Sequence, residues 1–439
     1  MFKKTITGLL ALGIVGSACA VALANSPSPQ IMGYSITIDS FDWGPGVSYL
    51  HLHTDLPVAQ VSVDDFSVVF NRLPGFLFPG APTTAISQSA IVESATVTDG
   101  VITLGLHIHP QTGVNPFTFT LSPMGNDWSE PFYPVITWYN QPGFIPPAFA
   151  MLGPSAPSFT PELINTYLPI VDDFMLAGTF TYADVTLQYA HFVPTGTATD
   201  IPLIIWLHGA GEGSQNNTAG SEVVLLGNRV TQLAAPEIQA YMGVGGAQVF
   251  TPQAPTVWLQ GTSVWGQGGY GYIGNYEAAL LAMIDEFVAN TPYIDKQRIY
   301  IGGCSNGGYM VMRLLIERPE LFAAAFPICL VYPEAWLTDE KIAILAQIPQ
   351  WFVHDINDPT TPHADSQRFF DLLRAAGGEQ IHLTTTDGLF SAEHLDAQGD
   401  PWQFDAHWSW IPALNNTITQ TIDGQEVSLF EWLAQQVRP

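Results

Sequence analysis

A serine between glycines is the side chain of this sequence best placed to do chemistry. Ser305 lies in the segment Gly-Cys-Ser-Asn-Gly at 303–307, after an apolar run at Arg298–Ile301 and before a helix-forming segment at Val311–Glu317. A G-x-S-x-G pattern lets the backbone bend sharply between a strand and a helix, which presents the serine hydroxyl at the tip of a sheet. The same five-residue pattern also occurs by chance in ordinary turns, so it indicates a nucleophile only if partners are present.

Candidate acids follow Ser305 in the chain, as this type of elbow requires. A serine hydroxyl is almost fully protonated at neutral pH, so it needs a base, and the base needs an acid that orients it. The loop after a buried strand at Ile348–His354 offers Asp355 and Asp358. Either aspartate alone would also suit a turn-capping role.

Three late histidines are candidates for the base. His382 lies inside the apolar run Gln380–Leu383, which favours a strand position, and His394 lies in the polar segment Ser391–Gly399. His407 lies between these and a closing helix, where a loop can reach over the serine. These positions disfavour His382 and leave His394 and His407 as candidates for the base.

A second glycine-rich loop supplies backbone donors for an oxyanion. The apolar strand predicted at Pro202–Leu207 runs directly into His-Gly-Ala-Gly-Glu-Gly at 208–213. We expect the oxyanion hole to use the N–H of Asn306 and one N–H of this loop, from Ala210 with Gly211 as its neighbour. In this loop, His208 and Glu212 are interpreted as organising residues.

The elements that position these residues alternate between strand and helix. From 173 to 439 this alternation predicts a mostly parallel sheet with helices on both faces, the α/β class. From 25 to 140 the pattern is instead short alternating strands with turns, including Asp99-Gly100, which predicts an all-β, immunoglobulin-like sandwich. The segment 141–172 is rich in Pro, Gly, Ser and Phe and is predicted to be a linker or surface loop.

The loop at 208–213, together with 303–310, resembles a group of secreted α/β-hydrolase esterases and predicted peptidases, related to polyhydroxybutyrate depolymerase-like and feruloyl-esterase-like enzymes. Some members carry an immunoglobulin-like domain before the catalytic one. The resemblance covers about 172–439, and its acid loop, aligned through two prolines, places the acid on Asp358 rather than Asp355. A family Gly-His-x-x-Trp segment matches His407, with Ala406 in place of the glycine. The resemblance thus implies the α/β-hydrolase fold and a Ser305, Asp358 and His407 triad.

Aromatic side chains accumulate in segments expected to border the cleft. Trp265, Tyr309 and Trp408 are the candidates for substrate binding, since aromatic rings in such loops can grip an aryl or polymeric ester. The alternative is that many of these rings only pack in the core. Small-molecule and polymeric ester substrates both remain open, and the sequence predicts no cofactor.

The first residues carry an export signal. Residues 1–24 show basic residues, an apolar run and a final Ala-Leu-Ala, the order of a secretory signal peptide that is too short to span a bilayer. We therefore expect a secreted protein, extracellular or periplasmic, without a membrane span. Lipid anchoring at Cys19 is the lesser alternative, because Gly16 stands where a lipoprotein signal has an aliphatic residue.

The net charge, the histidine pairs and the cysteines limit which partners and ligands the sequence predicts. There are 39 acidic and 12 basic residues, a net charge of −27, which disfavours nucleic acid as a partner. Two His-x-His pairs, at His51/His53 and His107/His109, lack evident further ligands, so no metal site is predicted. The sequence leaves open a disulfide between Cys304 and Cys329, and it leaves open the oligomeric state.

These features predict a secreted serine hydrolase that cleaves carboxylic esters through an acyl-enzyme. A serine peptidase with the same triad is the first alternative, because only the leaving group differs. A non-catalytic protein that binds a polymer or surface is the second, although such a role requires none of the three triad residues.

Overall fold

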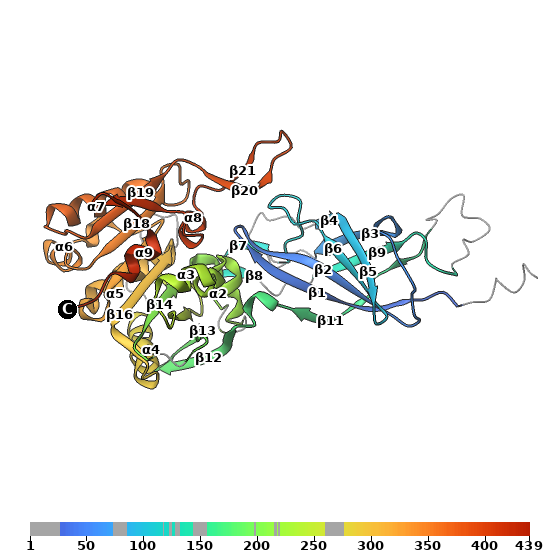
Figure 1. The fold of residues 1–439 in the computed structure, drawn as a ribbon, viewed down its shortest axis with the longest axis horizontal. Helices are drawn as coiled ribbons and strands as arrows, with labels where there is room; N and C mark the ends of the chain where they lie inside the picture. The colour runs from blue at the N-terminus through green and yellow to red at the C-terminus, as the bar shows by residue number, and fades with distance from the viewer. Residues whose placement is uncertain are drawn as a thin grey trace, which may run out of the picture.

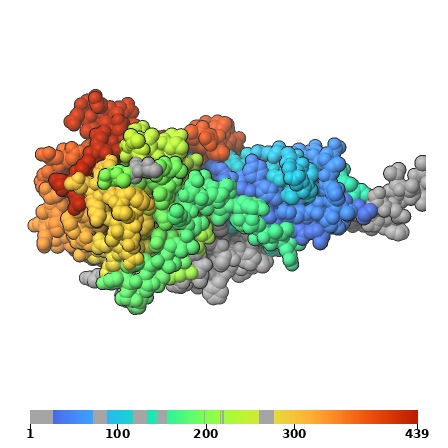
Figure 2. Space-filling model, turned by 60° about the horizontal axis from the view of Figure 1, so that its bottom comes forward, coloured from blue at the N-terminus to red at the C-terminus, as the bar shows by residue number. Residues whose placement is uncertain are grey.

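A computed structural model describes residues 27–72, 86–116, 118–122, 125–127, 132–143, 156–196, 199–214, 217, 220–259 and 276–439. An N-terminal unit of strands lies beside a larger unit of mixed strands and helices, and together they give the molecule an elongated outline (Figures 1 and 2). The predicted signal peptide with Cys19, and the substrate-binding candidate Trp265, fall outside the described residues.

Two sheets form the N-terminal unit. The first has the order β11 (Glu162–Tyr167), β1 (Ile31–Phe41), β2 (Gly44–Thr54), β6 (Val101–Leu106) and β5 (Val92–Thr98). The second has the order β10 (Ser158–Phe159), β9 (Phe132–Trp138), β3 (Phe66–Arg72) and β4 (Ile86–Ala90). A separate hairpin joins β7 (Thr118–Ser122) and β8 (Gly125–Asp127).

The two sheets share one apolar core. On β2, alternate residues such as Leu50 and Leu52 point inward and are fully buried. They pack in one cluster with Val68 of β3 and Trp138 of β9, which come from the other sheet. Hydrophobic alternation on both sheets thus holds them together as an all-β unit.

The N-terminal unit extends past residue 140, where the sequence suggested a linker or surface loop. Strand β11 pairs in parallel with β1, with Tyr167 opposite Thr37, and β10 pairs with β9 in the other sheet. The Pro- and Gly-rich composition of this segment hid both strands, because β11 is an exposed edge strand without a buried face.

An eight-stranded sheet organises the second unit. Its order is β12 (Phe174–Tyr182), β13 (Val185–Phe192), β15 (Gln248–Gln253), β14 (Ile201–Leu207), β16 (Ile294–Cys304), β17 (Ala324–Ile328), β18 (Gln350–Asp355) and β19 (Ile381–Thr386). The β12–β13 and β13–β15 pairs are antiparallel, and the pairs from β15 to β19 are parallel. All seven residues of β14 are buried, as expected for a strand covered on both faces.

Helices cover both faces of this sheet. One face packs against α2 (Glu222–Gly227), α3 (Pro236–Tyr241), α8 (Trp410–Leu414) and α9 (Leu429–Ala434). The other packs against α4 (Glu277–Asn290), α5 (Asn306–Glu317), α6 (Asp339–Leu345) and α7 (His363–Ala375). On β14 this division follows the strand period, because Ile204 and Trp206 face the first layer while Ile205 and Leu207 face the second.

Two hairpins follow the sheet. They are β20 (Leu389–Leu395) with β21 (Pro401–Phe404), and β22 (Thr419–Ile422) with β23 (Gln425–Ser428). The β20–β21 hairpin projects from the α/β unit toward the N-terminal unit (Figure 1). There His109 Nε2 donates a hydrogen bond to the carbonyl oxygen of Leu395 at 2.9 Å. No described helix is both long and apolar enough to cross a bilayer.

The turn between β1 and β2 makes a second contact between the units. The Asp42 carboxylate accepts hydrogen bonds from Arg229 Nη1 at 2.6 Å and from Asn415 Nδ2 at 2.9 Å. Trp43 beside it stacks on Phe404 of β21. The N-terminal unit is thus fixed to the α/β unit by an ion pair and by aromatic packing.

The start of α5 lies against the end of β14 at one glycine. A Cβ on Gly307 would lie 2.0 Å from the backbone oxygen of Leu207, which cannot move without breaking the sheet. A Cβ on the next residue, Gly308, would lie 3.2 Å from the oxygen of Ile328, a far smaller conflict. Only a residue without a side chain at 307 allows the helix to begin this close to the sheet.

We therefore expect Gly307→Ala to lower the free energy of unfolding by about 3 kcal/mol or more, since backbone would have to move. The matched change Gly308→Ala adds the same methyl group and gains helix propensity of about 1 kcal/mol, so its net effect should stay within about 1 kcal/mol. Urea unfolding of both variants measures the difference. Equal stability of the two variants would contradict this account of the helix start.

Candidate active site

The backbone of Ser305 has the strained conformation expected of a nucleophile at an elbow. Ser305 joins β16 directly to α5, with φ of 52° and ψ of −113°. A side chain other than glycine rarely adopts a positive φ, and the surrounding structure must hold it there. One such restraint is the hydrogen bond from the Ser305 N–H to the oxygen of Ile328, at 2.9 Å.

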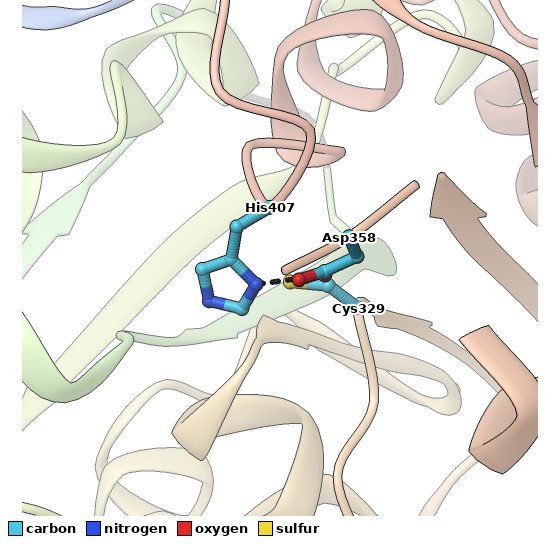
Figure 3. Close-up of side chains that lie close together, drawn as sticks. All are labelled: Cys329, Asp358 and His407. Carbon is cyan, nitrogen blue, oxygen red and sulfur yellow. Dashed lines mark hydrogen bonds and ion pairs between the residues drawn. The ribbon is translucent and has the colours of Figure 1, made fainter. Parts of the chain in front are cut away.

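Asp358 and His407 meet at the same edge of the sheet. Asp358 lies in the loop after β18, and His407 lies in the loop between β21 and α8. His407 Nδ1 donates to Asp358 Oδ2 at 2.8 Å. The other ring nitrogen, Nε2, is directed away from the carboxylate (Figure 3), so it is the atom available to a substrate or nucleophile.

Several donors hold the Asp358 carboxylate ionised. Its Oδ1 accepts hydrogen bonds from the backbone N–H groups of Thr360 and Thr361, at 2.7 and 2.9 Å. Its Oδ2 accepts from His354 Nε2 at 3.1 Å, besides the bond from His407.

Burial opposes this ionisation and would by itself raise the pKa of Asp358. The hydrogen bonds from His354 and His407, the charge of His407 and the Thr361 N–H together lower that pKa well below its ordinary value. Asp358 therefore stays negative throughout the neutral range, as a residue that fixes the orientation of an imidazole must.

The competing acid has a structural role. Asp355 is fully buried at the end of β18, and its Oδ2 accepts hydrogen bonds from Thr386 Oγ1 and the Gly388 N–H, each at 2.8 Å. Its Oδ1 accepts the N–H of Asn357. These bonds join β18 to the segment after β19.

The two competing histidines also lie elsewhere. His382 lies on β19, as its apolar surroundings predicted, and packs between Trp351 and Trp432. His394, expected in a polar loop, is instead on β20, where its ring contacts His109 and Trp43 of the N-terminal unit. Neither forms a hydrogen bond with Asp358 among the described residues.

The loop at 208–213 is built around buried polar groups. His208 Nε2 accepts a hydrogen bond from the Ala254 N–H at 3.0 Å, and the His208 carbonyl accepts from Trp258 Nε1. Ala210 and Gly211 lie in the 3₁₀ turn that follows. Because Leu207 pairs with Gly303, this turn emerges from the sheet beside the elbow, where Asn306 begins α5.

The predicted aromatic residues have different positions. Tyr309 is fully buried between Tyr332 and Trp336, so its ring packs in the core instead of lining a described surface. Trp408 is partly exposed next to His407 and lies against Phe404 and Trp410. Burial of Tyr309 follows from its place on the inner side of α5, which the sequence window did not reveal.

Both described cysteines are free thiols. Cys304 lies beneath the elbow with its Sγ 3.5 Å from Asn228 Oδ1, and Cys329 follows β17. The disulfide that the sequence left open is therefore not formed in this structure. Of the two thiols, Cys329 lies next to the pair of Asp358 and His407 (Figure 3).

Sequence reasoning missed two residues that hold the acid. His354 is fully buried, with Nδ1 accepting from Ser366 Oγ at 2.8 Å and Nε2 donating to Asp358 and to the oxygen of Thr361. Thr361 also donates from its side chain to Asp358 Oδ2, at 2.9 Å. The only signal was that His354 lies four residues before Asp358, near the end of β18, because hydrogen bonds between side chains in a loop have no sequence signature.

The His51/His53 and His107/His109 pairs make polar contacts across strands. His51 is hydrogen-bonded to Thr37 and Thr103, and His53 to Ser35. His107 forms an ion pair with Glu93. Among the described residues, neither pair belongs to a cluster of three metal-binding groups.

Comparisons with known proteins agree with this architecture. A crystal structure of a thermostable esterase is 24% identical and superposes with a TM-score of 0.65, covering 92% of this chain and 100% of that one. The chain therefore has the α/β-hydrolase fold. Residues 263–346 match the model of the prolyl oligopeptidase family, and no curated protein matches the sequence.

Two further solved structures each cover about half of this chain. LpqC, a poly(3-hydroxybutyrate) depolymerase from Bordetella parapertussis, is 18% identical with a TM-score of 0.34, covering 48% of this chain and 84% of its own. A ferulic acid esterase is 13% identical with a TM-score of 0.35, covering 49% and 91%.

Glu212 is a buried carboxyl group in the loop beside the elbow. Burial raises its pKa to about 7, although the N–H groups of Glu212 and Gly209 partly offset this. Its Oε2 has no hydrogen-bond partner within the described part of the chain, which suits a protonated acid. The folded protein thus holds a proton here that the unfolded chain releases near pH 4.5.

This proton predicts a pH-dependent stability. Because the folded pKa is raised, the contribution of Glu212 is complete below pH 4.5 and is lost as the pH rises through about 7. The unfolding free energy of Glu212→Gln minus that of wild type should therefore be about 3 kcal/mol larger at pH 8 than at pH 5. Urea unfolding at both pH values measures this gain. Glu340→Gln, at an exposed position, is the control, and parallel curves for wild type and Glu212→Gln would refute the prediction.

Proposed function

We propose that this protein is a secreted serine hydrolase that cleaves carboxylic esters, with Ser305 as nucleophile, His407 as base and Asp358 as the orienting acid. The observation that carries the proposal is the 2.8 Å hydrogen bond from His407 Nδ1 to a buried, ionised Asp358, at the sheet edge where Ser305 follows β16. The fold supports it, because this edge of an α/β-hydrolase sheet carries the reacting groups.

The proposed reaction has two steps. Ser305 Oγ attacks the ester carbonyl while His407 Nε2 takes its proton, and His407 then returns that proton to the departing alcohol. Water, activated by the same nitrogen, hydrolyses the acyl-enzyme. No cofactor takes part in either step.

Two backbone donors stabilise the oxyanion in this proposal. The N–H of Asn306 follows the nucleophile, and the second N–H comes from the turn at Ala210 and Gly211. Asn306 is held by its own side chain, whose Oδ1 accepts the Trp258 N–H at 2.6 Å. Such fixed donors need no rearrangement as negative charge develops, and each is worth about 10²-fold in rate or more.

A serine peptidase is the second candidate, favoured by the match of 263–346 to the prolyl oligopeptidase family. The same triad would serve, with an amine as leaving group. We favour esters because the full-length structural resemblance is to an esterase. A non-catalytic polymer- or surface-binding role is the third candidate, and it gives no reason for either a strained Ser305 after β16 or a hydrogen-bonded Asp358–His407 pair.

The remaining features of the proposal come from the sequence. Residues 1–24 support export as a signal peptide, with lipid anchoring at Cys19 as the lesser alternative, and we assign the N-terminal unit an immunoglobulin-like topology. The net charge of −27 favours neutral or cationic substrates, either small esters or polymeric ones bound partly by Trp408 and Trp265. Nucleic acid is not a proposed partner.

Paired kinetic assays test the proposal. Wild type should hydrolyse p-nitrophenyl acetate faster than a peptide p-nitroanilide, and Ser305→Ala should lower kcat by about 10⁶-fold. Asp358→Asn should lower kcat by about 10⁴-fold, because an amide would favour the wrong histidine tautomer.

Asp355→Asn provides the matched control for the acid. It makes the same chemical change three residues earlier, at the end of β18, but should keep kcat within about tenfold, while losing about 1–3 kcal/mol of stability to its mismatched hydrogen bonds. Equal turnover by wild type and Ser305→Ala would exclude the mechanism. Faster turnover of the anilide than of the ester would favour the peptidase.

A further inference from the structure

Three side chains of metal-binding type converge beside the proposed base. Cys329 Sγ, a carboxylate oxygen of Asp358 and a ring nitrogen of His407 all lie within 4.8 Å of one another. Figure 3 shows the thiol beside the carboxylate, with both facing the Nδ1 side of the imidazole. It is the one group of three such ligands among the described residues.

The sheet holds these groups in place from three separate loops. Cys329 follows β17, and its N–H donates to the oxygen of Val353 on the neighbouring strand at 2.8 Å. Thr361 spans the next gap, since its hydroxyl lies 3.2 Å from the Cys329 oxygen, 2.9 Å from Asp358 Oδ2 and 3.3 Å from His407 Nδ1. A ligand entering here would meet a cluster already assembled.

The donor set selects a class of cation. A thiolate, an imidazole and a carboxylate together suit Zn²⁺ and softer divalent ions, whereas Ca²⁺ and Mg²⁺ require mainly oxygen ligands. Around a tetrahedral Zn²⁺, ligand atoms at 2.0–2.3 Å from the metal stand roughly 3.5 Å apart. In this structure the three ligand atoms lie within 4.8 Å of one another, so the ligands must draw closer to bind one ion, and the 2.8 Å bond between His407 and Asp358 must open.

We propose that Zn²⁺, or a softer divalent cation such as Cd²⁺, binds Cys329, Asp358 and His407 and thereby inhibits the hydrolase. The binding depends only on these three side chains, whereas the inhibition rests on the proposed function of His407. Water would complete the coordination, as it does in zinc sites with three protein ligands.

Metal binding changes the protonation of two of the three ligands. Cys329 loses its S–H proton to solvent when sulfur binds the metal, and the Nδ1 proton of His407 is exchanged through water for one on Nε2. The imidazole remains neutral, but Nε2 now carries hydrogen and has no lone pair to accept the Ser305 proton. Metal binding therefore removes the base without touching the nucleophile.

The net charge of the chain favours the approach of a cation. Cys329 is fully buried and the Asp358 side chain is 0% exposed, whereas the His407 side chain is 13% exposed. The net charge of −27 raises the local concentration of cations around the protein.

A Cd²⁺ titration tests the binding without relying on activity. Cd²⁺ bound to a thiolate absorbs in the ultraviolet, so wild type should show this absorption with one equivalent per chain. Cys304→Ser should retain it and Cys329→Ser should lose it, because both replace a buried thiol but only Cys329 is in the cluster. Ser305→Ala should bind Cd²⁺ like wild type.

The second test measures whether Zn²⁺ inhibits hydrolysis of p-nitrophenyl acetate, as expected if metal binding removes His407 as the base. Each variant is compared with its own rate without metal, and thermal melting confirms folding. The Zn²⁺ concentration for half inhibition should rise at least about tenfold in Cys329→Ser and not in Cys304→Ser. Addition of a chelator should restore wild-type activity.

The outcomes separate the two proposals. Cd²⁺–thiolate absorption that persists in Cys329→Ser, or equal Zn²⁺ sensitivity of both cysteine variants, would overturn the metal site. If Cys329→Ser does not fold, an unchanged Cd²⁺ spectrum in His407→Gln would overturn it instead. A wild type that binds Cd²⁺ through Cys329 but hydrolyses no ester would support the site and refute the proposed function.

Discussion

The structure of the site depends on keeping one buried carboxylate charged. Burial by itself raises the pKa of Asp358, and a neutral acid would not hold the His407 ring with Nδ1 protonated. Donors from His354, from the backbone of Thr360 and Thr361, and from His407 itself reverse that preference. The hydrogen bonds of the loop after β18 therefore keep Asp358 ionised and fix its orientation. The proposed nucleophile, Ser305, lies at the strained elbow after β16.

The N-terminal unit contributes to the same arrangement through aromatic packing. Trp43 stacks on Phe404 with ring centroids 6.5 Å apart, and Phe404 in turn lies 6.2 Å from Trp408, the residue after His407. His109 adds a hydrogen bond to the β20–β21 hairpin that leads to this loop. The all-β unit thus packs against the hairpin and loop that carry the proposed base, His407. Contacts from both units therefore stabilise this segment.

Much of this organisation could be predicted because it is local in the sequence. The apolar run of β14, the glycines around Ser305 and the helix at 277–290 each have a short, clear pattern, and the fold followed from their order. Contacts between distant segments had no such pattern: β11 pairs with β1 across more than a hundred residues, and His394 joined a strand that its polar neighbours concealed. The choice of Asp358 over Asp355 rested on a resemblance, and the surrounding hydrogen bonds supply its physical reason. Burial of Tyr309, and the closeness of Cys329 to the acid, depend on how α5 and β17 pack.

In the proposed mechanism Ser305, His407 and Asp358 act as one unit on this frame. Labelling the protein with a fluorophosphonate, followed by mass-spectrometric mapping of the modified peptide, tests it most directly, because this reagent reacts with a serine only when a neighbouring base activates it. We expect a single fluorophosphonate adduct, on Ser305, and we expect His407→Gln to abolish it. An adduct on another residue, or labelling of Ser305 that is unchanged without His407, would contradict it.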